Sequence, residues 1–444
     1  MSNTLFPLPP AETPQDDAVV LSLPRVERPN RAQLELRSVD LDGLLPPDHR
    51  ARIVWEFVEG LDLSPLYAGI RAVEGGAGRP AIDPAILTAL WLYATLEGVG
   101  SARALDRLCE QHDAYRWIAG GVSVNYHTLA DFRVAHAEVL DALLTRSVAT
   151  LLSAGLVTLT RVAQDGVRVR ASAGAASFRR RARLQACVDE AEAQVRALRR
   201  ELDEDPAATS RRQAAARTRA VAERQARVLK ALEQVADLEA KQQQARDTAA
   251  RRRTARASVT DPEARVMKMA DGGFRPAFNA QMAADTGSQI IVGVDVGNVG
   301  SDLGQLPPMV AQLSRRYGRE PDEMLVDGGF AGHDAITDLA ARGCTVYAPV
   351  PQPKDPARDP HQPREADSAA VAQWRHRMGT EAAKTLYKLR AATAECINAI
   401  ARNRGLQQFR VRGLRKVKAV LLWFALAHNL LRAVELRLTA PAGT

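Results

Sequence analysis

Between residues 46 and 147, apolar residues recur three and four positions apart, and this spacing predicts a series of helices. The clearest begins at Asp83-Pro84, because Asp caps helix N-termini and Pro suits the first helical position, and it ends near Gly98. Further helices are predicted from Ser101, around residues 115–118, and from Asn125. Short helices joined by Gly-containing turns suit a helix-turn-helix DNA-binding domain. A plain helical bundle for oligomerisation is an equal alternative.

Two-residue alternation replaces this pattern after residue 155 and predicts strands. Residues 156–172 alternate around Asp165, and β-branched residues with Gly166 suggest a strand or hairpin there. Residues 278–285 and 289–296 predict an antiparallel hairpin. The remaining elements are predicted as a helix at 302–317, a short strand at 323–326 ending at Asp327, a helix at 334–342, a strand at 344–350, a long helix at 379–404 and a last helix at 413–436.

Residues 179–257 have a different pattern, that of a coiled coil. Apolar residues from Leu184 to Leu202 alternate four and three apart, which is a heptad seam. Asp205-Pro206 breaks the seam, and a second helix from about residue 210 has compatible spacing. We therefore expect an antiparallel helical hairpin inserted into the surrounding domain.

Without that insertion, the order of strands and helices is the ribonuclease H-like order. The predicted fold class is α/β: a ribonuclease H-like catalytic domain with an inserted antiparallel helical hairpin, preceded by an all-α N-terminal domain. The predicted parts are a flexible tail at 1–35, a helical DNA-binding domain at 36–150, a catalytic domain at 151–178 and 258–438, and the inserted coiled-coil hairpin at 179–257.

Three carboxylates occupy the places where this fold gathers its acids: Asp165, Asp327 and Glu395. Acids held this close repel one another unless a cation lies between them. Two divalent metal ions clamping the attacking and leaving oxygens would support phosphodiester cleavage. For any single Asp, an ordinary turn or cap role is the more common explanation. Asp285 and Asp295 are competing strand-end acids that periodicity does not exclude.

The charge of the chain points to a polyanionic partner. Its formal net charge is +8, which favours nucleic acid. Residues 375–418 contain twelve Lys or Arg against two acids. Arg390 and Arg402 lie near helical spacing from Glu395, so both are expected to flank it and contact phosphates. A solvated basic helix is the alternative.

Other features of the sequence bear on membrane contact, cellular location and zinc binding. No run approaches the roughly 20 apolar residues of a membrane-spanning helix, so no membrane partner is expected. The N-terminus lacks a cationic start followed by an apolar core, which predicts a cytoplasmic protein. The four cysteines are scattered without metal-type spacing, so no zinc site is expected.

Several motifs resemble those of the DDE transposases of bacterial insertion sequences, most closely the eleven-eighty-two group. The resemblance covers nearly the whole chain after the first 35 residues. Residues 78–84, 90–93 and 126–133 resemble the N-terminal domain of that family, and residues 271–281 the segment before the central hairpin. The remaining matches are Gln164-Asp165-Gly166 to the first acidic motif, Val326-Asp327-Gly328-Gly329-Phe330 to the second, the set Tyr387, Arg390, Glu395 and Arg402 to the third, and residues 409–414 and 427–430 to the C-terminal end.

The resemblance implies a transposase that binds terminal inverted repeats, hydrolyses the element ends and joins the freed 3′-hydroxyl to target DNA. It implies two Mg²⁺ ions, with Mn²⁺ able to substitute, on Asp165, Asp327 and Glu395. Partners would be double-stranded DNA and further copies of the chain, as a homodimer or larger assembly at the bacterial nucleoid. The expected DNA-contacting residues are Tyr387, Arg390, Arg402, Arg133, Arg410 and Arg412, with the helix of Arg133 in the major groove.

The sequence departs from the family pattern beside the third acid. Members often have Val before the Glu and an aromatic residue three positions after it, where this chain has Ala394 and Asn398. Two other hypotheses remain open. One is a domesticated DNA-binding protein that has lost catalysis on the same scaffold, and the other is a nuclease that only hydrolyses.

Overall fold

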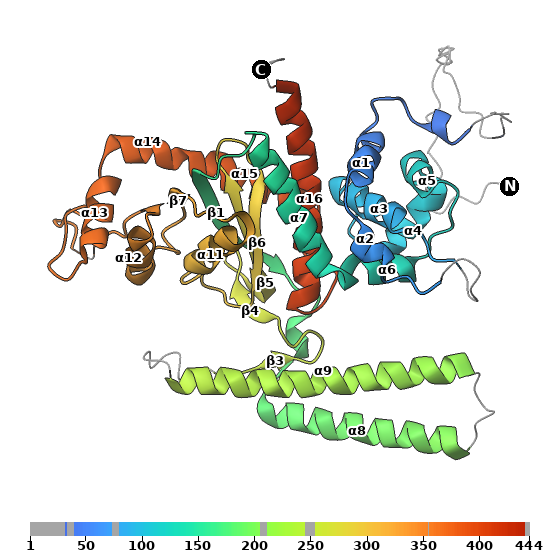
Figure 1. Cartoon of the computed structure of the whole chain (residues 1–444). Helices are drawn as coiled ribbons and strands as arrows, with labels where there is room; N and C mark the ends of the chain where they lie inside the picture. The colour runs from blue at the N-terminus through green and yellow to red at the C-terminus, as the bar shows by residue number, and fades with distance from the viewer. Residues whose placement is uncertain are drawn as a thin grey trace, which may run out of the picture. The chain divides into compact units, whose positions relative to one another are not determined.

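Six strands form the central sheet of the computed structural model, which describes residues 32, 40–72, 80–204, 211–244, 254–353 and 355–439. The path of the sheet is β4-β5-β1-β7-β8, and β6 also pairs with β5 (Figure 1). β1 is antiparallel to β5, whereas β1, β7 and β8 are parallel to one another. The strands are β1 (Arg161–Arg170), β4 (Arg265–Lys268), β5 (Phe274–Asp285), β6 (Ile291–Gly297), β7 (Glu323–Leu325) and β8 (Thr345–Tyr347).

The arrangement is consistent with a ribonuclease H-like domain. The central strand β5 is buried over ten consecutive residues, as expected of a strand with neighbours on both edges and elements packed on its faces. The predicted hairpin at 278–285 and 289–296 corresponds to β5 and β6. Across the turn between these strands, the amide of Asp285 donates a hydrogen bond to the carbonyl of Ile290 at 3.0 Å.

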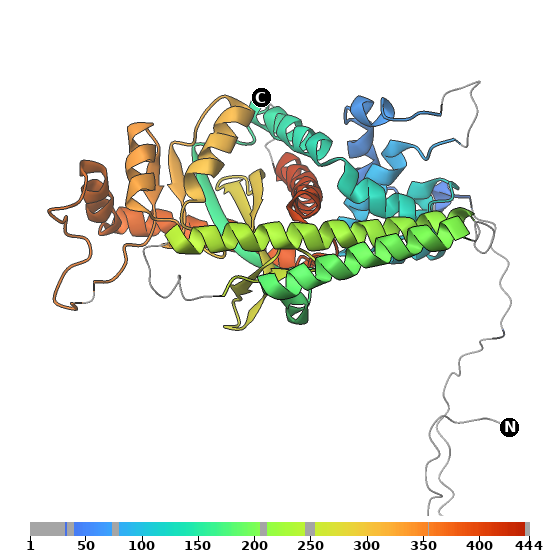
Figure 2. The ribbon, with the colours of Figure 1, turned by 90° about the horizontal axis from the view of Figure 1, so that it is seen from below.

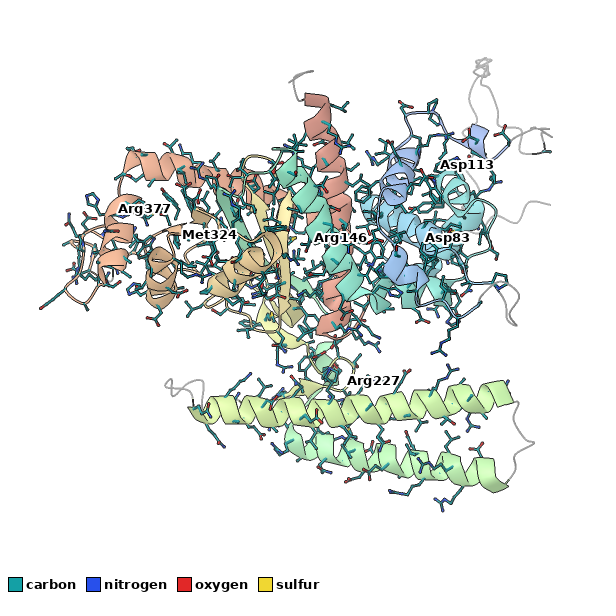
Figure 3. All side chains as sticks on the ribbon, in the orientation of Figure 1. Asp83, Asp113, Arg146, Arg227, Met324 and Arg377 are labelled. Atoms are coloured by element: carbon teal, nitrogen blue, oxygen red, sulfur yellow. The ribbon has the colours of Figure 1, made fainter. Side chains whose placement is uncertain are left out.

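The described residues between 41 and 153 form helices and no strand. Asp83 caps α3 by accepting a hydrogen bond from the amide of Ala85 at 2.8 Å, so the helix start expected at Pro84 is confirmed (Figure 3). Asn125 caps α6 in the same way. The elements are η1 (Asp42–Leu44), α1 (Arg50–Glu59), α2 (Ser64–Tyr67), α3 (Pro84–Leu96), α4 (Ala102–Gln111), α5 (Asp113–Ala119), α6 (Tyr126–Ala135) and α7 (Ala137–Ser153). The predicted tail at 1–35 lies, apart from residue 32, outside the described residues.

The last helix, α16 (Leu414–Thr439), joins these helices to the sheet. It packs against α3, α6 and α7 on the helical side and against β6 of the sheet (Figure 1). By length and composition, residues 414–438 would suffice to cross a membrane, which corrects the expectation that no segment comes near that length. Most of that segment is buried inside the fold, so α16 has the environment of a core helix.

Two helices between β1 and β4 lie side by side, α8 (Arg181–Glu204) and α9 (Arg211–Gln244), as Figures 1 and 2 both show. Leu184, Ala231 and Val235 are buried at their base in an apolar cluster separate from the main core. The chain enters and leaves through a two-stranded sheet, β2 (Phe178–Arg179) and β3 (Ala257–Ser258), preceded by the short η2 (Ala175–Ser177).

The helix predicted at 379–404 is not one regular helix. It consists of α14 (Glu381–Arg390), a π-helical turn η3 (Ala391–Glu395) and α15 (Cys396–Asn403). The helical run extends without a break over residues 381–403, close to the expected bounds. The π-helical turn inside it was not predicted, because apolar spacing does not reveal a single extra residue in a helical turn. The remaining helices are α11 (Leu306–Tyr317), α12 (His333–Ala341) and α13 (Ala369–Met378), the last of which was not predicted.

Candidate active site

The pairing of β1 with β7 sets Asp165 beside Asp327. In this parallel pair Ala163 aligns with Leu325. Asp165 and Asp327 each lie two residues further along, and side chains two residues apart in a strand point to the same face. Asp327 lies two residues after the end of the short strand β7, and its Oδ1 accepts a hydrogen bond from the amide of Gly329 at 2.7 Å.

Arg390 connects the first and third acids. Its Nη2 lies 3.1 Å from Asp165 Oδ1, and its Nη1 donates to Glu395 Oε1 at 2.7 Å. The Arg390 side chain is 9% exposed and that of Asp165 15%, whereas that of Glu395 is 57% exposed. Asp165 and Glu395 therefore meet at one buried guanidinium, and Asp327 acts on that guanidinium through its negative charge.

The π-helical turn explains how Arg390 and Glu395 meet. Five residues of a regular α-helix rotate about 140° beyond one full turn, which would put the two side chains on different faces. The turn at Ala391–Glu395 instead follows i→i+5 hydrogen bonding, so residues five apart lie on the same face. Turn η3 packs against β1 and β5, which places this face at the sheet.

Burial and neighbouring negative charges destabilise the ionised form of Asp165, and a nearby cation stabilises it. Burial raises the pKa of Asp165, the Arg390 guanidinium opposes that rise, and the negative charges of Asp327 and Asp302 add to it. Burial raises the pKa of Tyr387 to about 12, so its hydroxyl stays protonated. That hydroxyl donates to the carbonyl of Val326 at 3.1 Å and thereby joins α14 to the residue before Asp327.

Three carboxylates from separate elements form an oxygen donor set that suits a hard divalent cation. Among the described residues, however, no group of three His, Cys, Asp or Glu side chains is gathered closely enough to hold a metal ion. The Arg390 guanidinium occupies the space between Asp165 and Glu395. A cation that bridged these two acids would take over contacts that Arg390 makes here.

A fourth acid, Asp302, lies next to Gly166, close enough for its charge to act on Asp165, and the sequence did not point to it. Its carboxylate accepts from Arg168 at 2.7 Å, from Asn279 at 2.7 Å and from Gln281 at 2.9 Å, and its side chain is 5% exposed. A Cβ added at Gly166 would collide with this cluster, so the glycine is needed for close approach. The only sequence signal was the start of a predicted helix at residue 302.

Asn398, the residue that departs from the family pattern, contacts the first acid. Its side-chain amide donates to Asp165 Oδ2 at 2.9 Å, and the residue is 5% exposed. The hydrogen bond stabilises the ionised form of Asp165. The substitution beside Glu395 is therefore part of the site.

A cleft of about 740 Å³ opens next to Asp165. Five of its lining residues are Arg or Lys, against two Asp, so its walls are cationic. Such walls attract the phosphates of nucleic acid. The five are Arg168, Arg170, Lys268, Arg275 and Arg402. Of these, only Arg402 was singled out from sequence, because the strand residues lie far apart along the chain.

The remaining predicted DNA contacts lie elsewhere. Arg412 is exposed, and its Nε donates to the carbonyl of Ser172 at 3.3 Å. Arg410 lies across from Arg133 in a second, smaller cavity. The Arg133 guanidinium donates to the carbonyl of Gly100 at 2.7 Å and lies 4.6 Å from the ring centroid of Trp91, so it faces the inside of the fold.

The two competing acids have structural partners. Asp285 is buried and accepts hydrogen bonds from Leu159 and from the amide and hydroxyl of Ser288, which closes the turn between β5 and β6. Asp295 pairs with Lys418 on α16 at 3.3 Å. Both acids therefore fix local packing.

Comparison with protein families identifies two regions of the chain. Residues 232–430 match the family described as Transposase DDE domain, and residues 39–135 match the Transposase domain (DUF772). The two matches indicate an insertion-sequence DDE transposase. DDE transposase domains belong to DNA-cleaving and strand-transfer enzymes, which generally use divalent metal ions. No curated protein and no solved structure matches the chain.

The DDE match contains Asp327, Glu395 and the π-helical turn between Arg390 and Cys396, but it begins within α9. Asp165 therefore lies outside the matched region. Its position next to Asp327 and Arg390 follows from the pairing of β1 with β7 and from its contact with Arg390.

Proposed function

We propose that this transposase belongs to the eleven-eighty-two group, binds terminal inverted repeats, and cleaves and joins DNA strands at Asp165, Asp327 and Glu395. These acids would hold the divalent metals, Mg²⁺ with Mn²⁺ able to substitute. The bound metals would supply an activated water and stabilise the leaving oxygen.

The observation that carries the proposal is the contact of Arg390 with both Asp165 and Glu395, with the charge of Asp327 acting on the same guanidinium, beside the cationic cleft. DNA lying in that cleft would have its phosphates near Arg170, Lys268 and Arg402 while one scissile phosphate reaches Asp165. Asn398 and Arg390 would orient the Asp165 carboxylate, and the Tyr387 hydroxyl would hold the segment before Asp327 in place.

Substitution of the acids tests this assignment. Asp165→Asn, Asp327→Asn and Glu395→Gln should each abolish cleavage of a duplex carrying the inverted repeat that flanks the gene. Binding of the same duplex should persist, because each change removes one negative charge from a cationic site. Asp295→Asn is the matched control, since its partner Lys418 lies on α16, and it should cleave normally. Cleavage that survives in all three acid variants would refute the proposal.

The products of the same reaction separate the alternatives. Joined products with a target plasmid would identify a transposase, and hydrolysis alone would identify a nuclease. Binding without either product would identify the domesticated DNA-binding protein, which the presence of all three acids disfavours.

We propose further that residues 36–150 read the inverted repeats and that paired ends require a dimer or larger assembly in the cytoplasm. A footprint that survives deletion of residues 1–145 would contradict the first part. Sedimentation of the protein with bound ends would measure the second.

A further inference from the structure

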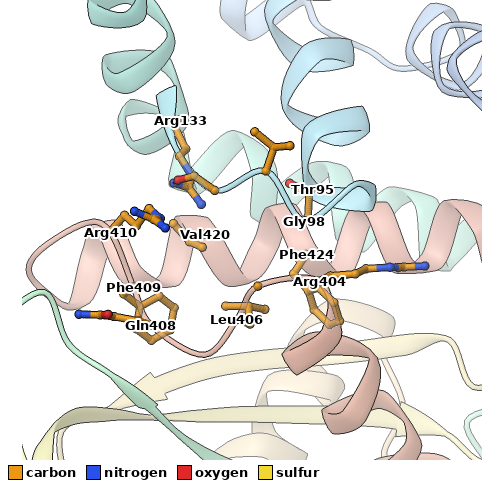
Figure 4. A pocket seen from close by; sticks show the side chains of 13 residues that line it. Thr95, Gly98, Arg133, Arg404, Leu406, Gln408, Phe409, Arg410, Val420 and Phe424 are labelled. Atoms are coloured by element: carbon orange, nitrogen blue, oxygen red, sulfur yellow. The ribbon is translucent and has the colours of Figure 1, made fainter. Parts of the chain in front are cut away.

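A cavity of about 90 Å³ lies between the helices before residue 135 and the segment leading into α16. Figure 4 shows Arg133 and Arg410 approaching each other across it, from α6 and from the segment before α16. Arg404 also lines the cavity, but in that view its guanidinium points away from the pair. The volume lies between that of one water, about 30 Å³, and that of a benzene-sized cavity, about 150 Å³.

The two guanidinium groups flank the same glycine. A Cβ built on Gly100 would lie 3.7 Å from Arg410 Nε and 4.0 Å from Arg133 Nη2. A side chain at this position would therefore fill the space between the two cations. Glycine keeps that space open.

Neither cation has an acidic partner within the described part of the chain. The ion pairs found there include neither Arg133 nor Arg410. The buried Nε of Arg133 has no hydrogen-bond partner among the described residues. Burial and the nearby charge of Arg410 lower the pKa of Arg133 to about 10. Arg410 is exposed and Arg133 is half-buried with a buried Nε. An anion between the two guanidinium groups would relieve the repulsion between their charges.

We infer that Arg133 and Arg410 form a binding site for a phosphate group, at the junction between the N-terminal helices and the catalytic part of the chain. A tetrahedral oxyanion would accept from both guanidinium groups, including the free Nε of Arg133, and would neutralise their repulsion. The site deepens the proposed DNA-binding role of these two residues and lies outside the cleft of the three acids. A failure here would leave the proposed cleavage chemistry untouched.

A phosphate bound at this site would connect the N-terminal helices to the segment before α16. Trp423 of α16 donates to the carbonyl of Arg133 at 3.0 Å, so Arg133 is already attached to the helix that crosses both parts. A phosphate bridging Arg133 and Arg410 would add a second connection at this junction. Its source is either a backbone phosphate of bound DNA or free phosphate.

The first experiment measures thermal unfolding of the full chain in inorganic phosphate against chloride at equal ionic strength. Phosphate should raise the Tm of the wild type with saturation, because a ligand that binds only the folded state stabilises it. Arg410→Gln should weaken the apparent phosphate affinity by about tenfold or more, since it removes a charge-assisted contact. Lys416→Gln, which removes an exposed cation nearby, should respond like the wild type.

Arg410→Lys keeps the charge and should retain part of the response, and circular dichroism verifies that each variant is folded. Equal phosphate responses in Arg410→Gln and wild type would overturn the assignment. So would a rise in Tm that chloride reproduces, or no saturable rise at all.

The second experiment distinguishes the source of the phosphate. With a duplex oligonucleotide, the plot of log affinity against log salt should become shallower by about one phosphate contact in Arg410→Gln if DNA supplies the group. Inorganic phosphate should then compete with the duplex. An unchanged slope and no competition would assign the site to free phosphate.

Discussion

Arg390 acts as an internal counter-ion at the scale of single residues. It is almost fully buried and pairs with both Asp165 and Glu395. Exposed ion pairs contribute little to stability, so the half-exposed Glu395 gains little from this contact. Asp165 gains more, because a buried carboxylate without a cation is costly. Arg390 therefore keeps the acids close together when no metal is bound.

This role predicts that Arg390→Met makes stability depend on metal. The variant should lose about 3 kcal/mol, the order expected when one partner of a buried pair is removed. Mg²⁺ should raise its Tm more than that of the wild type, because the ion replaces the missing charge. Thermal unfolding with and without MgCl₂ measures both effects.

Arg402→Met is the control for this prediction, since Arg402 lines the same cleft without pairing with the three acids in the described structure. It should show the Mg²⁺ response of the wild type. An Arg390→Met variant as stable as the wild type, or one insensitive to Mg²⁺, would contradict the role of Arg390.

The sequence permitted prediction of these acids but not of their partners. Asp165 and Asp327 were expected from the predicted strands and the family motifs, and in the structure each lies two residues beyond the aligned pair Ala163 and Leu325. The motifs also pointed to Arg390, but as a contact for phosphate rather than for Asp165. Asp302 and its three donors come from three separate segments, so no local pattern contains them.

At the scale of elements, the π-helical turn η3 carries one residue more than a regular turn. Deleting the exposed Ala391 should therefore convert the turn to α-helix and leave Arg390 and Glu395 four apart, on the same face. The flanking helices would keep their packing. Tm should fall only slightly, and cleavage should persist.

Deleting the exposed Lys388 from the regular helix α14 is the matched comparison. Removing one residue from a regular α-helix rotates the residues on either side of the deletion by about 100° relative to each other. Tyr387 would therefore no longer lie on the same side of α14 relative to Arg390. This variant should lose cleavage and unfold at a clearly lower temperature. Equal behaviour of the two deletions would show that η3 does not set the register.

Helix α16 contacts the turn between β5 and β6 through His428, and this contact should make stability depend on pH. His428 is buried, its Nε2–H donates to the carbonyl of Gln289 at 3.0 Å, and burial lowers its pKa to about 4. The unfolded chain takes up the proton at a higher pH than the folded chain. Stability is therefore fully present above pH 6.5 and is lost as pH falls toward 4, by about 3 kcal/mol in all.

Denaturant unfolding between pH 7 and pH 4 measures this loss. His428→Gln keeps a neutral donor without a titrating group and should flatten the profile over that range. His136→Gln is the control, because His136 is less buried, and it should keep most of the slope. A His428→Gln profile as steep as that of the wild type would refute the assignment.

Helices and strands with clear caps or alternation were predictable, and two elements, the π-helical turn and β4, were not. The Asp83 cap located α3 to the residue, and alternation located β5 and β6 closely. The π turn was not predictable, because its five residues are ordinary helix formers. Strand β4 has four residues and pairs only with one end of β5, so its sequence is too short to show alternation.

At the scale of the whole molecule, we expect the helical hairpin α8–α9 to be separable from the rest. Its base has its own apolar cluster, and Lys230 reaches the neighbouring segment through an ion pair with Glu263 at 3.2 Å. Replacing residues 181–256 with a short turn should therefore leave the main core folded, with only a small change in Tm. Calorimetry tests this.

Sedimentation of the same variant tests whether the hairpin mediates assembly. Replacing only residues 200–214, which connect α8 to α9 along the chain, is the control, since it leaves the base intact. Failure of the full excision to fold, with the control variant folded, would show that the base supports the core.

Strands β2 and β3 bring the start and the end of this hairpin next to each other, with Arg179 opposite Ala257. The distance between β2 and β3 is therefore independent of the length of the segment that connects them. Evolution can lengthen, shorten or exchange this segment without disturbing the acids. Among homologous chains, differences in length should concentrate at this one position, and a foreign domain with neighbouring termini should be tolerated there.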